Sequence, residues 1–281
     1  MKKYLFLILF ANTLTIGFGQ LESPFGYGAM SLGQGNAFAG GQSHHAILYN
    51  QAGTAFNKNP SFALDAANLY NSSGLSHFHL TGIYPSSLGV FGMKIQRYGI
   101  EEFNYQNYSL SYSRKLFENF SAALAFNFYQ FRITNYGSKL IPNIDLGIQT
   151  KISSKLSMGF HLRNGLPLEI TENTEFPSII TFGIKYQVND FVDLFTDVEK
   201  NIRENESIKF GVSYLIHPVL RIRTGISTFP ASYSFGADII LQKISIHIGN
   251  SFHQVLGNTS GLSLHYSIPT KAPQSELQSS F

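Results

Sequence analysis

Seven charged residues between positions 193 and 238 are the side chains best spaced to interact with one another. They share one face of four consecutive strand-like stretches, at Asp193, Asp197, Glu199, Lys209, Arg221, Arg223 and Asp238. Neighbouring stretches present opposite charges, so cross-strand pairs are expected. Two interpretations stay open: a simply polar interior, or an ion-paired network that fixes an inserted segment and closes a pore. Either one disfavours an apolar tunnel along this side, because an apolar ligand would have to desolvate the charges.

Histidines could supply a metal site or a pH-sensitive cluster. His77 and His79 share the face of one predicted strand, His247 and His265 lie on the last two, and His44-His45 precedes the strands. Nothing in the sequence fixes their heights relative to one another, so we expect them to be scattered and solvated. We predict no metal site and no cofactor.

No catalytic residues are predicted, because no Ser and His stand out as a pair with an orienting partner. The chain has no cysteine, which excludes disulfide staples and lipid attachment through cysteine. Its formal charge is +3, and removal of Lys2 and Lys3 with a signal peptide would leave +1. So weak a field predicts no nucleic-acid partner.

These side chains must be positioned by strands, because the second half of the chain alternates apolar and polar residues. Between Lys243 and Phe252, Ile244, Ile246 and Ile248 alternate with Ser245, His247 and Gly249. About fourteen such runs are found, many of them 10 to 14 residues long, which is enough to cross a bilayer at a tilt. The predicted strands are 61–72, 75–85, 88–99, 103–116, 119–134, 139–152, 155–165, 176–188, 191–202, 206–216, 219–228, 231–241, 243–253 and 258–268. We therefore predict an all-β fold, a transmembrane antiparallel β-barrel over residues 61–268 whose apolar face contacts outer-membrane lipid.

The segments outside the barrel have distinct compositions. Residues 1–19 begin with Lys2 and Lys3, continue with an apolar run and end in small residues, which predicts a signal peptide. Residues 20–60 are rich in Gly, Ala, Ser and Asn without a period of two, and residues 269–281 form a polar tail. Because a fourteen-stranded barrel is too wide for its own side chains to fill, we predict that residues 20–60 form a plug in the lumen. Seven glycines on the inward face could receive its backbone or bend the strands: Gly147, Gly159, Gly183, Gly211, Gly225, Gly236 and Gly249.

Two runs in the predicted plug resemble a known family. The run Gly28-Ala29-Met30-Ser31-Leu32-Gly33-Gln34-Gly35-Asn36-Ala37-Phe38-Ala39-Gly40 is followed by Ala46-Ile47-Leu48-Tyr49-Asn50-Gln51-Ala52-Gly53-Thr54-Ala55. Together they resemble the amino-terminal signature of FadL-like outer-membrane barrels, most closely the PorV and PorQ branch linked to type IX secretion. The resemblance implies fourteen strands with the amino-terminal segment inside them. The chain departs from the family pattern at Gln51, where proline is usual, and at Ser43-His44-His45, where acidic residues are common.

We expect the plug to dock through Gly33, Gly35, Asn36, Phe38, Tyr49, Asn50, Ala52 and Gly53. Gly33 and Gly35 would let its backbone lie against the wall, and Asn50 could cap a short helix that begins near Gln51.

The sequence predicts a multi-pass protein of the outer membrane of a Gram-negative bacterium, without enzymatic activity. Its short connections and charged lumen favour an accessory or scaffold subunit of a secretion or assembly machine, docked on a larger outer-membrane protein. The alternatives are a FadL-like transporter of small hydrophobic molecules and a diffusion porin. The identity of the partner or cargo, the opening of the lumen and the oligomeric state stay open.

Overall fold

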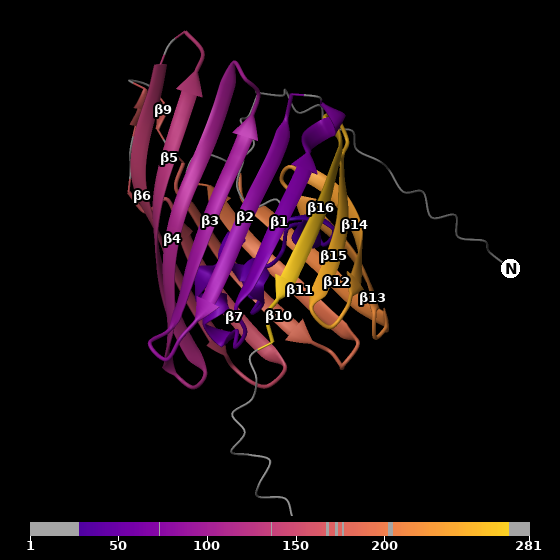
Figure 1. Cartoon of the computed structure of the whole chain (residues 1–281). Coiled ribbons are helices and arrows are strands. Elements are labelled where there is room, and N and C mark those ends of the chain that lie inside the picture. Colours follow the sequence, from indigo (N-terminus) through magenta and orange to yellow (C-terminus); the bar gives the residue numbers. More distant parts are fainter. Residues whose placement is uncertain are drawn as a thin grey trace, which may run out of the picture.

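The computed structural model describes residues 28–72, 74–135, 137–166, 169–171, 174–175, 177–201 and 205–269. Within these residues fourteen antiparallel strands close into a barrel, which confirms the predicted fold class (Figure 1). Each barrel strand pairs with the next one along the chain, and the last pairs with the first. The barrel strands are β1 (Ser61–Asn68), β2 (Ser76–Pro85), β3 (Val90–Gly99), β4 (Phe103–Phe117), β5 (Phe120–Ile133), β6 (Gly137–Lys151), β7 (Leu156–Arg163), β10 (Ile179–Gln187), β11 (Val192–Asn201), β12 (Ser207–His217), β13 (Leu220–Thr228), β14 (Ala231–Ile240), β15 (Ile244–His253) and β16 (Gly257–Ser267).

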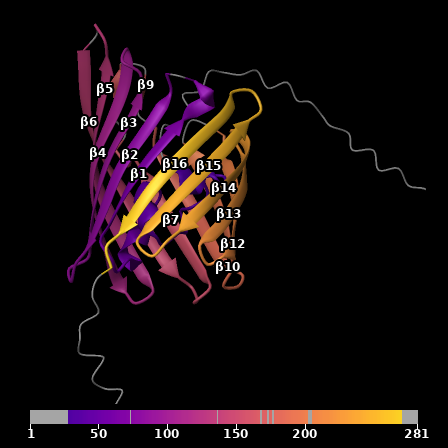
Figure 2. The same cartoon turned by 45° about the vertical axis from the view of Figure 1, so that its right-hand side comes forward.

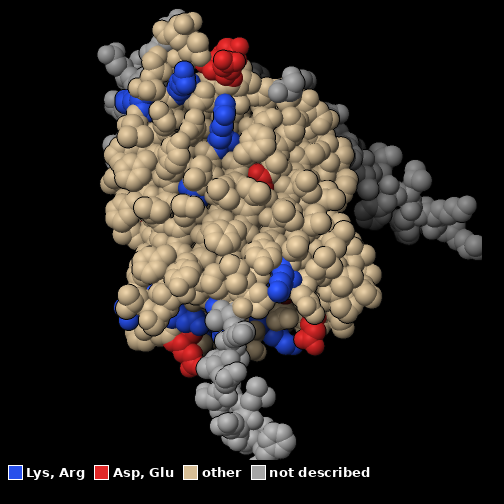
Figure 3. All heavy atoms as spheres, viewed as in Figure 1, with Lys and Arg blue, Asp and Glu red and all other residues tan. Residues whose placement is uncertain are grey.

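The outer wall is apolar, as the alternating pattern predicts. On β12, for example, Ile208 and Tyr214 point outward and are 50% and 45% exposed, whereas Ser213 between them is buried. On the face drawn in Figure 3, charged side chains gather toward the two ends of the barrel, with an almost uncharged belt between them. A closed barrel leaves no unpaired strand edge, and an apolar belt of this kind is stable only against hydrocarbon. The fold is therefore that of an outer-membrane barrel.

The two ends of the barrel differ in their connections. One end carries tight turns, such as Glu118-Asn119 between β4 and β5, and the other carries the longest connections, at 69–75, 164–178 and 202–206. Since such barrels keep short turns in the periplasm, the longer connections face the exterior. Exposed outward tyrosines mark the short-turn end, at Tyr84, Tyr112, Tyr186, Tyr214 and Tyr266. They form an interfacial girdle there.

The strand predictions need two corrections. The first predicted strand, 61–72, ends early, because Tyr70 and Asn71 take positive φ angles of 56° and 52° in the short 3-10 turn η3 (Leu69–Asn71). The connection after β7 holds a two-stranded hairpin, β8 (Glu169–Thr171) with β9 (Thr174–Glu175), which the sequence analysis does not predict.

A plug fills the lumen ahead of β1. It contains the short helix α1 (Ala29–Leu32) and the 3-10 helices η1 (His44–Leu48) and η2 (Gln51–Phe56), and nearly all of its residues up to Ala55 are buried. Figures 1 and 2 both show these helices inside the barrel, in the half nearer the short turns. The predicted signal peptide, residues 20–27 and the tail from 270 onward lie outside the described residues. Among the described residues no helix is long and apolar enough to cross a bilayer.

Candidate functional site: a plugged lumen with two unlike walls

Glycines on the inner wall let the plug backbone lie directly on the sheet. A methyl group added to Gly249 would lie 2.0 Å from the carbonyl oxygen of Ala29, and one on Gly225 would lie 2.2 Å from the carbonyl carbon of Gln34. All seven glycines of the predicted inward face have plug atoms among the nearest neighbours of such a methyl group, at Gly147, Gly159, Gly183, Gly211, Gly225, Gly236 and Gly249. These positions therefore serve close approach of two backbones.

Glycines of the plug also allow this close approach. A methyl group on Gly33 would lie 2.8 Å from the Cα atom of Gly236, and Gly35 has a positive φ of 71°. Inside the plug, a methyl group on Gly53 would lie 2.2 Å from the carbonyl oxygen of Gly41. Side chains at these three motif positions would push the plug off the wall or apart.

Asn50 ties the plug to the barrel and to itself. Its Nδ2 donates to the carbonyl oxygen of Ile148 on β6 (2.9 Å), to that of Ala39 (3.1 Å) and to Oε1 of Gln149 (3.1 Å). Its Oδ1 accepts from the backbone N–H of Ala52 (3.2 Å), which confirms the predicted cap of a short helix. The carbonyl oxygen of Ala52 in turn accepts from Ser121 on β5 (2.8 Å). The fully buried Asn50 thus hydrogen-bonds three segments at once: strand β6, the plug backbone at Ala39 and the start of η2.

The aromatic motif residues form the apolar centre of the plug. Phe38 stacks on Phe195 of β11 at 5.6 Å between ring centroids and meets Tyr49 edge-on at 5.8 Å. Tyr49 hydrogen-bonds the hydroxyl of Ser31 and donates to Oδ1 of Asn36 (3.4 Å). Burial raises the pKa of Tyr49, so its hydroxyl stays protonated and available to donate.

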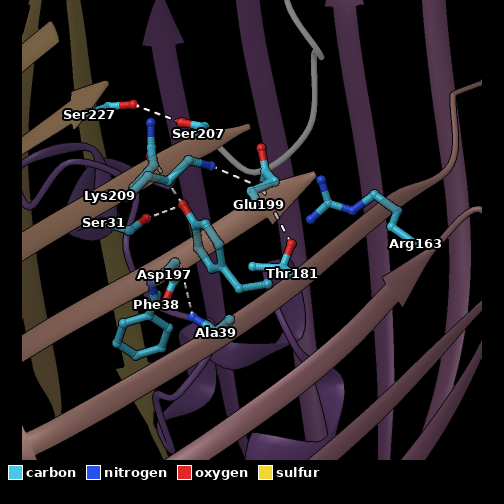
Figure 4. A network of polar contacts seen from close by, with 12 residues as sticks. Ser31, Phe38, Ala39, Arg163, Thr181, Asp197, Glu199, Ser207, Lys209 and Ser227 are labelled. Atoms are coloured by element: carbon cyan, nitrogen blue, oxygen red, sulfur yellow. Dashed lines mark hydrogen bonds and ion pairs between the residues drawn. The ribbon is translucent and has the colours of Figure 1, made fainter. Parts of the chain in front are cut away.

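Of the predicted lumen charges, Asp197 on β11 binds the plug backbone. Its Oδ2 accepts from the N–H groups of Phe38 (2.8 Å) and Ala39 (2.9 Å), and its side chain is buried (Figure 4). A buried carboxylate needs such donors, because an unpaired charge inside a protein is costly.

Arg223 and Asp238 form a second contact with the plug. Nη2 and Nε of Arg223 on β13 lie 2.6 Å and 2.7 Å from Oδ2 of Asp238 on β14. Nδ1 of His247 on β15 lies 2.8 Å from the other carboxylate oxygen. Nη1 of Arg223 also donates to Oε1 of Gln34 in the plug. Three neighbouring strands therefore position one guanidinium against the plug.

The remaining predicted charges lie apart from this contact. Lys209 and Glu199 pair at 2.9 Å (Figure 4), and Asp193 pairs at 3.3 Å with Lys185 of β10. The Nε atom of Arg221 is buried without a hydrogen-bond partner in the described part of the chain. The seven residues are thus split into separate small groups, and only Asp197 and Arg223, with Asp238 behind it, reach the plug.

Four histidines meet where the plug faces the short turns, contrary to the expectation that they are scattered. The ring of His44 lies 4.9 Å from that of His265, and the ring of His45 lies 4.9 Å from that of His247 and 5.6 Å from that of His265. Burial, followed by the neighbouring imidazoles, lowers the pKa of His44 to about 3 and that of His45 well below its usual value. Among the described residues no group of three or more His, Asp or Glu side chains could hold a metal ion.

The opposite wall, on β3 to β6, is aromatic. The buried Tyr105 and Tyr129 stack at 5.7 Å, Phe131 lies 5.3 Å from Tyr105, and Ile141 and Tyr98 pack against the same cluster. This cluster was not predicted from the sequence, although strand parity signals it: Tyr105 and Tyr129 share the inward faces of their strands with buried asparagines. His77 joins its edge, with its ring 5.7 Å from Tyr98 and 4.2 Å from that of His79.

A polar cavity of about 450 Å³ lies between the plug and the charged wall, near the short turns. Its lining includes Phe38, His44, Lys185, Arg221 and Asp238. Acidic, basic and imidazole groups therefore surround this cavity at the periplasmic face of the plug.

No family model and no curated protein matches this chain. Solved structures do: the CymD monoaromatic hydrocarbon channel (TM-score 0.67, 11% identity, 88% of this chain and 99% of that one) and the Pseudomonas putida toluene transporter TodX (0.64, 12%, 86% and 97%). A Pseudomonas aeruginosa FadL homologue also matches (0.62, 12%, 85% and 98%). At such low identity the likeness concerns the fold alone. The chain thus has a FadL-like outer-membrane barrel fold, and none of these structures bears on the PorV and PorQ branch.

Proposed function

We propose that this FadL-like barrel is a channel for small, largely apolar molecules across the outer membrane, and that residues 28–60 are its gate. The observation that carries the proposal is the aromatic cluster of β3 to β6, which faces the lumen toward the extracellular end. Aromatic rings offer an apolar solute dispersion contact and edge-to-face geometry without a charge to desolvate. Two of the structurally similar proteins, a monoaromatic hydrocarbon channel and a toluene transporter, support the same class of solute.

The division of the lumen supports a route along one side only. The charged wall holds the plug through Asp197 and Arg223 and offers an apolar solute no favourable surface. The aromatic cluster of this wall packs against its own members, so a flat solute could replace a ring contact there without breaking an ion pair. Movement of the plug would then complete the passage to the periplasm.

Uptake of radiolabelled toluene into proteoliposomes tests this function. We expect Tyr105→Ala with Tyr129→Ala to slow toluene entry, because both rings leave the lumen wall. Tyr108→Ala is the matched control, since Tyr108 lies on the same strand but points outward and is 42% exposed. Equal toluene entry for wild type, the lumen variant and protein-free liposomes would exclude the proposal.

A second candidate is the accessory subunit of a secretion or assembly machine, as in the PorV and PorQ branch that the plug motif resembles. The anchoring of the plug by buried groups favours it, because a barrel so firmly closed suits a docking role. Photo-crosslinking residues at outward positions 160, 182, 210 and 264 test it in living cells, since the native Phe160, Phe182, Phe210 and Leu264 are exposed on the wall. One adduct of a single size from adjacent strands would favour docking, and none would favour the free-standing channel.

An open diffusion porin fits the structure least, because the plug and the inward side chains fill the lumen.

A further inference from the structure

An apolar groove of about 390 Å³ crosses the outer wall where β16, β1, β2 and β3 lie side by side. It exists because Ala66 of β1 has a short side chain between two large neighbours in register with it, Leu262 of β16 and Phe78 of β2. Both neighbours are 54% exposed and form its sides. The groove therefore opens toward the hydrocarbon of the membrane, and water cannot be its ordinary occupant.

Arg97 lies at the rim of this groove. It is in register with Phe78, so it continues the same row of outward side chains onto β3. Below it Ile95 is outward and apolar, and above it the strand ends at Gly99. Arg97 has no ion-pair or hydrogen-bond partner among the residues that the structure describes. A guanidinium at the edge of an apolar belt is costly unless it reaches an anion or the headgroup layer.

We propose that this groove is a lipid site, in which one acyl chain lies along Ala66 and the phosphate of an anionic lipid binds Arg97. The longer connections place this rim at the extracellular end, so the lipid belongs to the outer leaflet. Phosphate matches the planar fork of arginine, which can donate two parallel hydrogen bonds to it. The apolar groove fits the acyl chain of such a lipid, and the unpaired Arg97, in register with Phe78 at its rim, fits the phosphate.

The site lies on the seam where the barrel closes. On the inner side of the same β1 strand, Asp65 accepts from Ser263 of β16, and Oγ of Ser263 accepts from the N–H of Ala29 in the plug (3.2 Å). A lipid in the groove would contact both strands of this seam from outside, while the plug joins them from inside. The bound lipid is thereby expected to stabilise the closed barrel.

Native mass spectrometry of the purified full-length mature protein with added hexa-acylated lipid A bisphosphate tests the site. We expect one lipid per barrel to survive activation in the wild type. Arg97→Gln should lower its occupancy about tenfold or more, because a charge-assisted contact is lost. Ala66→Phe should abolish it by filling the groove.

Two matched controls separate a built site from the general lipid coat. Arg132→Gln removes an exposed arginine from β5, away from the groove, and Ala237→Phe adds a ring beside Ile222 and Ile248 on the far wall. Both should bind lipid A as the wild type does. If Ala66→Phe does not give the heat-modifiable gel shift that marks a folded barrel, the lipid occupancy of Ala66→Leu and Arg97→Gln still tests the site. Equal lipid adducts in all variants, or retention of palmitate but not lipid A, would overturn the proposal.

Discussion

Two regions of the inner wall differ in what they contact: β10 to β15 lie against the plug, whereas β3 to β6 carry the aromatic cluster. On the first, glycines bring the sheet within backbone contact of the plug, and Asp197 and Arg223 bind it. On the second, Tyr105, Tyr129 and Phe131 pack against one another near the extracellular end. The charged wall needs the plug to satisfy its buried groups. The aromatic cluster packs within itself, on the extracellular side of the residues through which β4 to β6 bond the plug, Ser113, Ser121 and Gln149. Loss of the plug should therefore disturb the charged wall far more than the aromatic cluster.

Gly249→Leu should have the largest effect. The added side chain would occupy the position of the Ala29 carbonyl, and the rigid β15 backbone cannot withdraw, so the plug must leave this wall. We expect planar-bilayer recordings to change from closed to stably conducting. Gly165→Ala is the control, because its nearest neighbours lie at ordinary contact distances of 3.4 Å or more. Unchanged conductance in Gly249→Leu would show that the plug does not depend on close approach.

Asp238→Asn should come next. It removes the charge that pairs with the buried Arg223 and bonds His247, and breaking a buried pair costs about 3–5 kcal/mol. We expect the urea midpoint for protease cleavage of the plug to fall sharply. Asp193→Asn provides the comparison, because its pair with Lys185 is partly exposed and worth about 1 kcal/mol or less. Similar losses in the two variants would contradict a special role for the buried pair.

Acid should weaken plug docking through His44 and His45. His44 is held neutral between Ser61 (2.8 Å) and Thr81 (2.7 Å), and His45 faces His247, His265 and Arg223.

Because the folded pKa of His44 is lowered to about 3, docking is at full strength above about pH 6.5 and weakens as pH falls from there toward 3. Each pH unit costs up to about 1.4 kcal/mol per histidine. Single-channel opening should become more frequent between pH 6.5 and 4, and His44→Gln with His45→Gln should flatten that profile. An identical profile in the double variant would assign the effect to other groups.

Tyr105→Leu should have the smallest effect on closure. Loss of one stacked aromatic pair costs about 0.5–1.5 kcal/mol beyond its buried area, so the barrel should unfold at slightly lower urea. Conductance should stay at the wild-type level, since the plug is held by Asp197, Arg223 and Asn50 and not by this stacked pair. If Tyr105→Leu opens the channel as often as Gly249→Leu does, the plug depends equally on both walls and the proposed difference between them is wrong.

The faces of the strands could be predicted from the sequence, because lipid and lumen demand different side chains at alternate positions. This parity put Asp197, Arg223 and the glycines on the inner wall, and the plug motif identified Asn50 as a cap. The pairing of groups could not be predicted, because it depends on the register and stagger of the whole barrel. Asp193 therefore meets Lys185 on β10, a strand that carries none of the predicted charges, and the histidines from opposite ends of the chain come together.

The aromatic wall escaped prediction for a different reason. Tyrosines suggest an interfacial girdle when they lie on an outward face, and nothing in a single strand separates that role from inward packing. Only the joint parity of Tyr105 and Tyr129 on adjacent strands does so.

The bond between Ala29 and Ser263 joins residues 234 positions apart, and this separation constrains the order of assembly. The plug is made first, yet the wall that it contacts through α1 belongs to β14, β15 and β16, which are made last. The surface on which α1 docks is therefore absent until almost the whole chain is present, whereas η2 contacts the earlier strands β4 to β6. Once β1 has paired with β16, the lumen is accessible only from its ends. Contacts so distant in sequence form late and slowly. Closure of the seam between β1 and β16 and docking of α1 are thus expected to be one concerted final step. A chaperone or assembly factor that holds β1 apart from β16 would then also keep α1 from its wall and leave that side of the lumen open.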